Sequence, residues 1–349
     1  MILSGSCTAF ATLSILILMF MHATHFSRPN EQQKILKICW LVPLYTCLSL
    51  VTIAFPNAFA YLMPWLDFFQ SIALTSFFLL LCQYISPNDV EREMFFTPLR
   101  IAQRKTNQAT PSQSGLVWYR RKWINVFQYP VVAIIVAVAT DITQGAHIYC
   151  LESSKPYFAH LWLNIISVAS LIFAVLGVFG FYTQLKSELR QHKPLAKFLA
   201  FKLVIALTFI ERIIFWILRS TNSLKPTATL TYVDLNMGIQ TMLTCIEMVP
   251  FSIFFHYAYD VKPYLISSTR PLCPSTMTNP HAQYDDSKPA LSPMLRTTDA
   301  DSDYVTEGLR YQDGFLGYRA WISLFNPMEI IRGMMFAFRM ASELRSGNV

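Results

Sequence analysis

The chain has 349 residues, of which 53% are hydrophobic and only 14% are charged, whereas soluble domains carry about 25% charged residues. The apolar residues stand in long blocks of about 20, the length that crosses a bilayer. This pattern excludes a pair of soluble domains. In such a protein the net charge of +7 indicates basic loops and contact with anionic lipid rather than nucleic-acid binding.

Residues 1–264 are predicted to form an all-helical bundle of seven transmembrane helices. A signal peptide is the competing interpretation of the first block, but no Lys or Arg precedes Arg28, so a signal anchor fits better. Pro43 predicts a kink in the second helix. The seven predicted spans cover residues 2–21, 35–55, 62–85, 123–143, 161–182, 198–218 and 235–259.

The tail changes character twice. Residues 265–314 are rich in Ser, Thr, Pro and Asp, which predicts a disordered linker. Residues 315–345 are aromatic and amphipathic, with Asn326 as a predicted N-cap and Pro327 at the first helical position. This pattern predicts a helix on the membrane surface or against the bundle. A soluble helix with a mixed surface is the alternative.

Basic residues predict the orientation. Residues 86–122 contain seven of the 28 Lys and Arg residues, and residues 186–197 contain four. The loops on the opposite side contain three in all. The positive-inside rule therefore places the N-terminus outside or in a lumen, and the C-terminus in the cytoplasm.

Several polar residues interrupt the apolar blocks. A charged group at the centre of a membrane helix costs about 2.5–3.5 kcal/mol on insertion scales, so such residues mark functional sites by default. We expect these residues to line a polar path for an anionic amphipath. Buried pairs that only fix helix register are an equally weighted alternative. The candidates are Asp67, Gln70, Gln128, Glu211, Arg212 and Glu247.

Helix geometry places two of these candidates at similar depth. At about 1.5 Å per residue, Asp67 and Arg212 lie roughly 8 and 10 Å below the outer face and could pair. Glu247 lies near the midplane. In this hypothesis Arg212 attracts the anionic head of the solute, and one of the acids competes for it when the site is empty.

Other cations are placed to contact lipid headgroups. Lys202 lies about one turn from the cytoplasmic end of its span and is expected to snorkel. A cluster beside aromatic residues resembles an interface anchor. We expect headgroup contacts from Arg120, Arg121, Lys122, Lys202, Arg332 and Arg339.

No cofactor, metal centre or enzyme activity is predicted. His22 and His25 form an H-x-x-H pattern at a helix end, but zinc needs further ligands, and a capping or packing role is favoured. The sequence has no G-x-S-x-G, no phosphate-binding glycine loop and no H-E-x-x-H.

Motifs in consistent order point to a family. The segment with His22, His25, Phe26, Pro29, Glu31 and Gln32 resembles the opening signature of the organic solute transporter alpha / transmembrane protein 184 family. Similar matches follow at Phe127-Gln128-Tyr129, Lys193-Pro194, Cys245-Ile246-Glu247-Met248 and Lys262-Pro263-Tyr264. The family's R-D-x-Y-E-A motif corresponds here to Leu66-Asp67-Phe68-Phe69-Gln70-Ser71, so the aspartate is kept. The sequence of this third predicted span most resembles that of fungal members of the family.

The resemblance implies a seven-span protein. Its best-known animal members move bile acids and steroid conjugates by facilitated diffusion with a single-span partner subunit, and other members are associated with vacuolar or other endomembranes. We therefore expect a facilitative transporter of organic amphipaths. The expected partners are lipids, the amphipathic solute, and a single-span subunit or further copies of the chain. The plasma membrane and an endomembrane both remain open. The alternative is a seven-span receptor or scaffold that recruits partners through its loops and tail.

Overall fold

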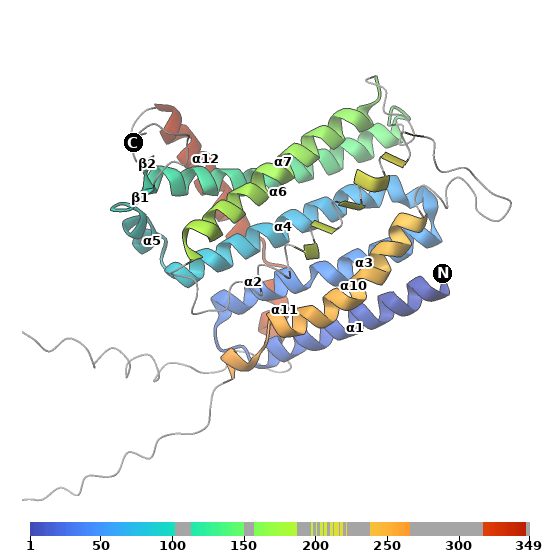
Figure 1. Cartoon of the computed structure of the whole chain (residues 1–349), viewed down its shortest axis with the longest axis horizontal. Coiled ribbons are helices and arrows are strands. Elements are labelled where there is room, and N and C mark those ends of the chain that lie inside the picture. Colours follow the sequence, from blue (N-terminus) through green and yellow to red (C-terminus); the bar gives the residue numbers. More distant parts are fainter. Residues whose placement is uncertain are drawn as a thin grey trace, which may run out of the picture.

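Long apolar helices lie side by side in the computed structural model, which describes residues 1–101, 113–149, 157–186, 238–265 and 317–346 and isolated positions between 197 and 221. Among these residues, six helices are long and apolar enough to cross a membrane (Figure 1). They are α1 (Ile2–Thr24), α2 with α3 (Pro29–Cys39 and Leu41–Ala54), α4 (Phe59–Ile85), α6 (Gly115–Gly145), α7 (Ala159–Gln184) and α10 (Ile239–Ala258).

Six of the predicted spans thus coincide with helices. The remaining predicted span, 198–218, falls largely outside the described residues, so the total of seven stays a prediction. The predicted linker at 265–314 lies outside them as well, apart from residue 265. From α1 to α7 the long helices alternate in direction, whereas α10 runs in the same direction as α7, and the N-terminus lies at the opposite end of the bundle from α5, β1 and β2 (Figure 1).

The second predicted span is divided at Trp40. Helix α2 ends at Cys39, and α3 begins at Leu41. Pro43 lacks an N–H, and its ring crowds the carbonyl four residues earlier, which is that of Cys39. The predicted kink is confirmed.

Small residues bring α6 and α7 together. Ser167, Ser170 and Gly177 are buried on one face of α7, and α7 packs along α6. A Cβ atom at Gly177 would lie 3.1 Å from Val126 Cγ2. The small side chains therefore allow the two helices to approach each other closely.

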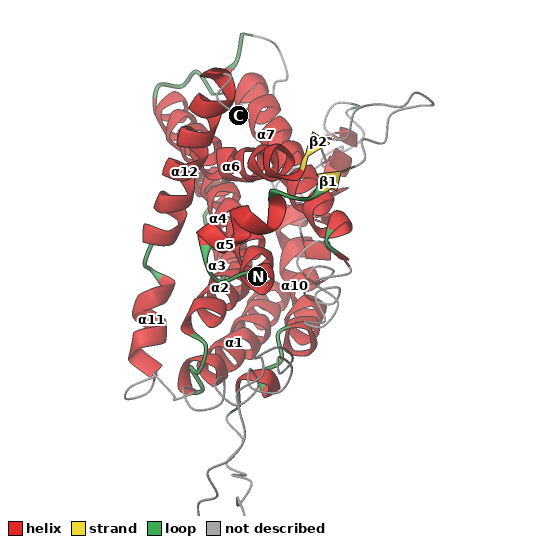
Figure 2. Ribbon diagram, turned by 90° about the vertical axis from the view of Figure 1, so that its left-hand side faces the viewer, coloured by secondary structure: helices red, strands yellow, loops and turns green. Residues whose placement is uncertain are grey.

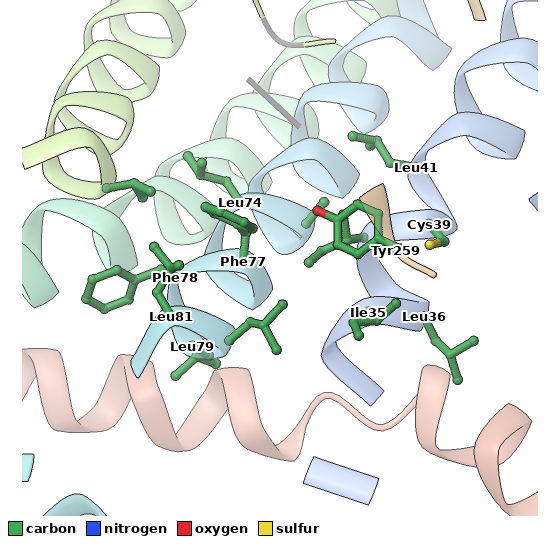
Figure 3. Close-up of a cluster of buried hydrophobic side chains, with 14 of the residues drawn as sticks. Ile35, Leu36, Cys39, Leu41, Leu74, Phe77, Phe78, Leu79, Leu81 and Tyr259 are labelled. Carbon is green, nitrogen blue, oxygen red and sulfur yellow. The ribbon is translucent and has the colours of Figure 1, made fainter. Parts of the chain in front are cut away.

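Aromatic and aliphatic side chains fill the space between the helices. Phe77, Phe78 and Leu81 of α4 point towards neighbouring helices, and Tyr259 lies just after α10 in the same cluster (Figure 3). Phe78 meets Phe181 of α7 edge to face, with ring centroids 5.0 Å apart. This core joins α4 to the helices on both of its sides.

Short elements lie at the ends of the bundle. At one end are α5 (Asp89–Phe96), the two-residue strands β1 (Arg100–Ile101) and β2 (Gln113–Ser114), which pair antiparallel, and η4 (Lys262–Tyr264). At the opposite end, η1 (Pro56–Ala58) stands just before α4. Asn88 caps α5 by accepting from the Val90 amide at 3.2 Å. Arg92 is buried, pairs with Asp89 at 3.0 Å and donates to the Ser86 carbonyl.

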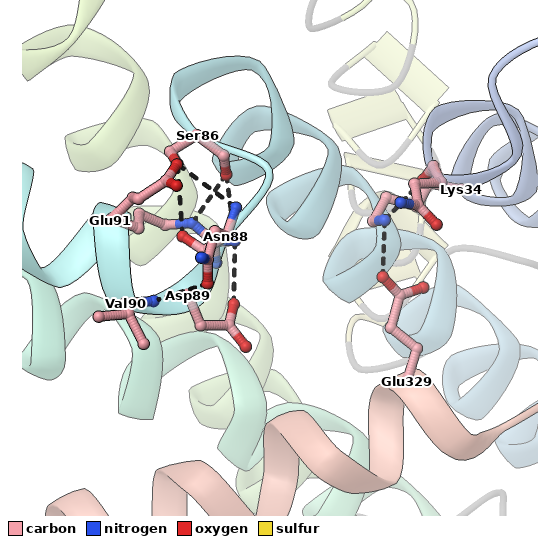
Figure 4. Close-up of polar contacts among 9 residues, drawn as sticks. Lys34, Ser86, Asn88, Asp89, Val90, Glu91 and Glu329 are labelled. Carbon is pink, nitrogen blue, oxygen red and sulfur yellow. Dashed lines mark hydrogen bonds and ion pairs between the residues drawn. The ribbon is translucent and has the colours of Figure 1, made fainter. Parts of the chain in front are cut away.

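The C-terminal helices cross the bundle and do not run parallel to it (Figures 1 and 2). Helix α11 (Tyr318–Leu324) packs on α1 and α2, and α12 (Met328–Ser346) packs on α4 and α6. The predicted cap is confirmed, because the Met328 amide donates to Asn326 Oδ1 at 3.0 Å. Lys34 of α2 holds α12 through an ion pair with Glu329 at 2.6 Å (Figure 4). The tail helix therefore lies against the bundle.

Candidate functional site

Asp67 borders a cavity inside the bundle. The cavity measures about 140 Å³. Asp67 is 9% exposed, and its Oδ2 accepts a hydrogen bond from Ser167 Oγ of α7 at 3.3 Å. The cavity is formed by residues from α4, α6, α7 and α10, among them Met63, Pro64, Val136, Thr140, His160, Asn164 and Gln240. The predicted acid thus faces the interior of the bundle and not the lipid.

Gln70, three residues after Asp67, points to a different neighbour. It is buried, and its Oε1 accepts from the Tyr45 hydroxyl of α3. Gln70 does not line the cavity around Asp67. It therefore joins α3 to α4, which fits the register alternative better than the path.

Gln128 plays a similar part between α6 and α7. Its Oε1 accepts from Ser170 Oγ at 2.8 Å, and its Nε2 donates to the Ser170 carbonyl, also at 2.8 Å. Two hydrogen bonds to one residue fix the rotation of both helices. Gln128 also lies outside the residues that line the cavity.

Glu211 and Glu247 face each other. Glu211 is 5% exposed and accepts from Thr244 Oγ1 at 3.3 Å. Glu247 lies near enough to act electrostatically on this carboxyl group. Gln240, Thr244 and Glu247 recur at spacings of four and three, so they share one face of α10. This face reaches from the cavity, at Gln240, to the two carboxyl groups about 10 Å further along the helix.

Arg212 and Lys202 lie outside the described residues, so the pairing of Asp67 with Arg212 stays a prediction. The other predicted headgroup contacts differ in their surroundings. Arg121, Arg332 and Arg339 are exposed, and Lys122 is half-buried, with its Nζ 5.9 Å from the centroid of Trp118. Arg120 is only 14% exposed and pairs with Glu93 at 3.8 Å and Glu343 at 3.3 Å, which ties α6 to α5 and α12.

Polar residues near the helix ends were missed by the sequence analysis. His160, Asn164 and Gln240 contribute to the cavity, although each stands close to a helix terminus, where polar side chains ordinarily face headgroups. Asp141 of α6 accepts from Trp65 Nε1 of α4 at 2.9 Å. A polar side chain within about one turn of a helix end was the available signal, but it does not say which way the side chain points.

The residues of the opening signature meet the end of α10. His22 Nε2 is 2.9 Å from the Tyr259 carbonyl oxygen. Gln32 Nε2 donates to the His25 carbonyl at 2.8 Å, and the Tyr264 hydroxyl donates to Glu31 Oε2 at 3.1 Å. We call His22, Glu31, Gln32, Tyr259 and Tyr264 the clasp, because they join the α1–α2 turn to the segment after α10.

The clasp gives the H-x-x-H pattern a structural role. His22 is buried and bonded to backbone, and the ring of Tyr264 lies 5.5 Å from its own. Within the described part of the chain, no group of three or more His, Cys, Asp and Glu residues is placed to hold a metal ion.

Together, these features define a multi-pass helical membrane protein with polar groups enclosed in its bundle. The sequence model of the organic solute transporter Ostalpha family matches residues 1–264, and the chain belongs to this family.

Two curated relatives agree with the family. The chain is 25% identical over 272 residues to a transmembrane protein 184 homolog of Dictyostelium discoideum, an alignment that covers 76% of this chain and 53% of the relative. It is 26% identical over 280 residues to Protein LAZ1 of Arabidopsis thaliana, covering 74% and 57% respectively. The chain therefore spans about half the length of these relatives. No solved structure matches.

Proposed function

We propose that this protein carries amphipathic organic anions, such as bile-acid-like or steroid-like molecules, across the membrane down their gradient. The observation that carries the proposal is the cavity at Asp67, which is lined by side chains of α4, α6, α7 and α10 in a bundle whose family is named for solute transport. The polar face of α10 continues from this cavity towards Glu247. Each polar group in an apolar bundle raises the cost of insertion, so a line of such groups marks a functional path by default.

The size of the cavity constrains the mechanism. At about 140 Å³ it is smaller than the roughly 300–1,000 Å³ of pockets that hold drug-sized ligands. A sterol-sized solute therefore does not fit this cavity unless α4, α7 and α10 separate. In our proposal Arg212 attracts the anionic head, and Asp67 competes for Arg212 when no solute is present.

Flux in proteoliposomes tests this function. Purified full-length protein is reconstituted and assayed for uptake of labelled bile acids and steroid sulfates. We expect uptake above that of empty vesicles, and a change of about tenfold or more in D67N, because this variant removes a charge from the cavity. D141N is the matched control, since Asp141 is an acid of α6 that does not line the cavity. Equal flux in D67N, D141N and wild type, at equal reconstitution, would refute the path.

A scaffold is the second candidate. The observation that favours it is the firm attachment of α11 and α12 across the bundle, which presents a rigid surface beside the tail. Deletion of the chain after Tyr264 separates the two functions. Retained flux supports the carrier, whereas loss of partner recruitment, from an intact protein without flux, supports the scaffold.

A further inference from the structure

A second cavity lies between helix α12 and the end of the bundle that carries α5. It measures about 620 Å³, which is within the roughly 300–1,000 Å³ of pockets that hold small-molecule ligands. Its walls come from α2, α4, α5, α6 and α12, with Asp89 and the Lys34–Glu329 ion pair among the residues that border it (Figure 4). No residue that lines the cavity at Asp67 also lines this one. The two cavities are therefore separate sites.

The charged groups around this second cavity leave one cation over. Lys34 is paired with Glu329 at 2.6 Å, and Arg92 is paired with Asp89 at 3.0 Å. Arg332 of α12 is the remaining charged residue of the lining. It is exposed and forms no ion pair with another described residue. The lining thus holds three cations against two acids, which favours an anionic ligand.

Hydrogen-bond donors from three helices border the same cavity. The side chains of Gln33 of α2 and Gln83 of α4 are half-buried and, like that of Arg332, form no hydrogen bond with another described residue. Amide and guanidinium groups both donate to anionic oxygens. A carboxylate has two oxygens, whereas a phosphate monoester has three strong acceptor oxygens. A phosphate therefore fits donors that come from three helices better than a carboxylate does.

A smaller, mostly apolar cavity adjoins the first and distinguishes a lipid from a soluble phosphate ester. It measures about 190 Å³ and lies where α11 and α12 meet α3 and α4. Its walls include Trp40, Leu44, Phe69 and Ile330. Asn326, just before α12, borders both cavities. A polar cavity next to an apolar one matches a phospholipid, in which a phosphorylated headgroup is followed by acyl chains.

The position of the polar cavity agrees with a lipid ligand. Asp89 and Arg92 belong to residues 86–122, the segment with seven Lys and Arg residues that is predicted to be cytoplasmic. The cytoplasmic leaflet carries the anionic lipids, and basic pockets between transmembrane helices on that side bind phosphorylated headgroups. The cavity is thus expected at the level where such headgroups lie.

We propose that the polar cavity binds the headgroup of an anionic phospholipid that bears a phosphate monoester, with an acyl chain in the adjoining apolar cavity. The phosphate accepts hydrogen bonds from Arg332, Gln33 and Gln83. The site is complete only when α12 lies against the bundle, so the lipid stabilises the docked position of α12. The lipid thereby links the tail helix to the bundle, and this role does not depend on the carrier function proposed above.

Native mass spectrometry of the full-length protein in a non-ionic detergent tests the ligand. The probes are a dioctanoyl phosphatidylinositol monophosphate, dioctanoyl phosphatidylcholine, and the inositol phosphate headgroup without its chains. We expect the phosphoinositide to bind at least about tenfold more tightly than either of the other two, because only it offers both the phosphate monoester and the chains. Equal binding of phosphatidylcholine would overturn the phosphate site. Equal binding of the free headgroup would overturn the lipid and favour a soluble phosphate ester.

Three charge variants test where the phosphate binds. R332Q should weaken phosphoinositide binding by about tenfold, because it removes a charge-assisted hydrogen bond. D89N should strengthen binding several-fold, because it removes an acid from the cavity, and the Asp89 side chain is 80% exposed, so the fold tolerates the change. R339Q is the matched control, since Arg339 is an exposed cation of the same helix that does not line the cavity. Equal weakening in R332Q and R339Q, or weaker binding in D89N, would overturn the site.

Proteolysis tests the link between the lipid and α12. Cleavage by trypsin after Arg339, which lies outside the cavity, requires α12 to open. Saturating phosphoinositide should slow this cleavage several-fold in the wild-type protein, and phosphatidylcholine should leave it unchanged. Cleavage that is equally fast with and without the bound phosphoinositide would overturn the stabilisation of α12.

Discussion

Replacement of Gly333 by alanine should release helix α12 from the bundle. A Cβ atom at this position would overlap the ring of Phe127 in α6. That ring cannot move aside, because it is 1% exposed and stacked on Trp123 with centroids 4.7 Å apart. Helix α12 must therefore shift away from α6, which breaks the 3.0 Å hydrogen bond from Trp123 Nε1 to the Gly333 carbonyl.

The magnitude follows from three contributions. Forcing an extra methyl group into a packed contact costs about 1–3 kcal/mol. Leaving the buried indole N–H without an acceptor costs about 1–3 kcal/mol. Alanine recovers about 1 kcal/mol, because it is a better helix former than glycine. The docked state of α12 should thus lose about 3 kcal/mol, which is roughly a hundredfold in the docking equilibrium.

Proteolysis measures this equilibrium. Arg332 and Arg339 are exposed but helical, so trypsin cuts after them only when α12 opens, and the rate follows the open population. G333A should be cut after Arg332 roughly a hundredfold faster than wild type. G5A is the control, because a Cβ atom at Gly5 meets nothing within 4 Å. Equal rates in G333A and G5A would refute the argument.

Three further predictions concern stability in detergent. H22A should lower the free energy of unfolding by about 2 kcal/mol, because it leaves the buried carbonyl of Tyr259 without its partner. His25 is half-buried, so the control variant H25A should lower the free energy of unfolding by less. Equal effects of the two variants would contradict the role of the clasp. G177L should lower the free energy of unfolding by more than about 2 kcal/mol, because the larger side chain overpacks the contact between α6 and α7. In the control variant G180A the new methyl group meets only the flexible end of a lysine side chain, so its stability should be unchanged or slightly higher. Thermal melting of the two variants measures the difference. Burial lowers the pKa of Lys197 from 10.5 to about 8. As the pH is raised, the folded state therefore loses this proton at a lower pH than the unfolded state does. Stability should rise between pH 8 and 10.5 by up to about 3 kcal/mol, and K197Q should remove the rise.

The helices could be predicted from sequence because length and apolar content determine them. The predicted span at 62–85 corresponds to α4, Phe59–Ile85, and the Pro43 kink follows from the ring of one residue. The attachment of the tail is different. Lys34 and Glu329 meet in space but stand far apart in the chain, and amphipathicity alone does not distinguish a lipid surface from a protein surface as the partner of α12.

The candidate site was predictable in its residues but not in their directions. An apolar helix that is hydrophobic on every side gives no periodic signal for its rotation. The sequence therefore selected Asp67, Gln70 and Gln128 alike, although only Asp67 borders the cavity. Gln240 was missed for the same reason, since its importance depends on the rotation of α10.

The chemistry of each polar group helps to decide between path and register. An amide can donate and accept, so it can be satisfied by a single neighbour on another helix, as Gln128 is by Ser170. Such a pair gains nothing by opening, and it fixes the helices in one rotation. A carboxyl group has more acceptor capacity than an apolar bundle can fill. Among the described residues, Glu211 keeps a shielded oxygen without a donor, and that oxygen can accept from a proton, a cation or a passing donor. Gln70 and Gln128 therefore hold the helices in place, and the acids of the bundle are the groups on which a change of state can act.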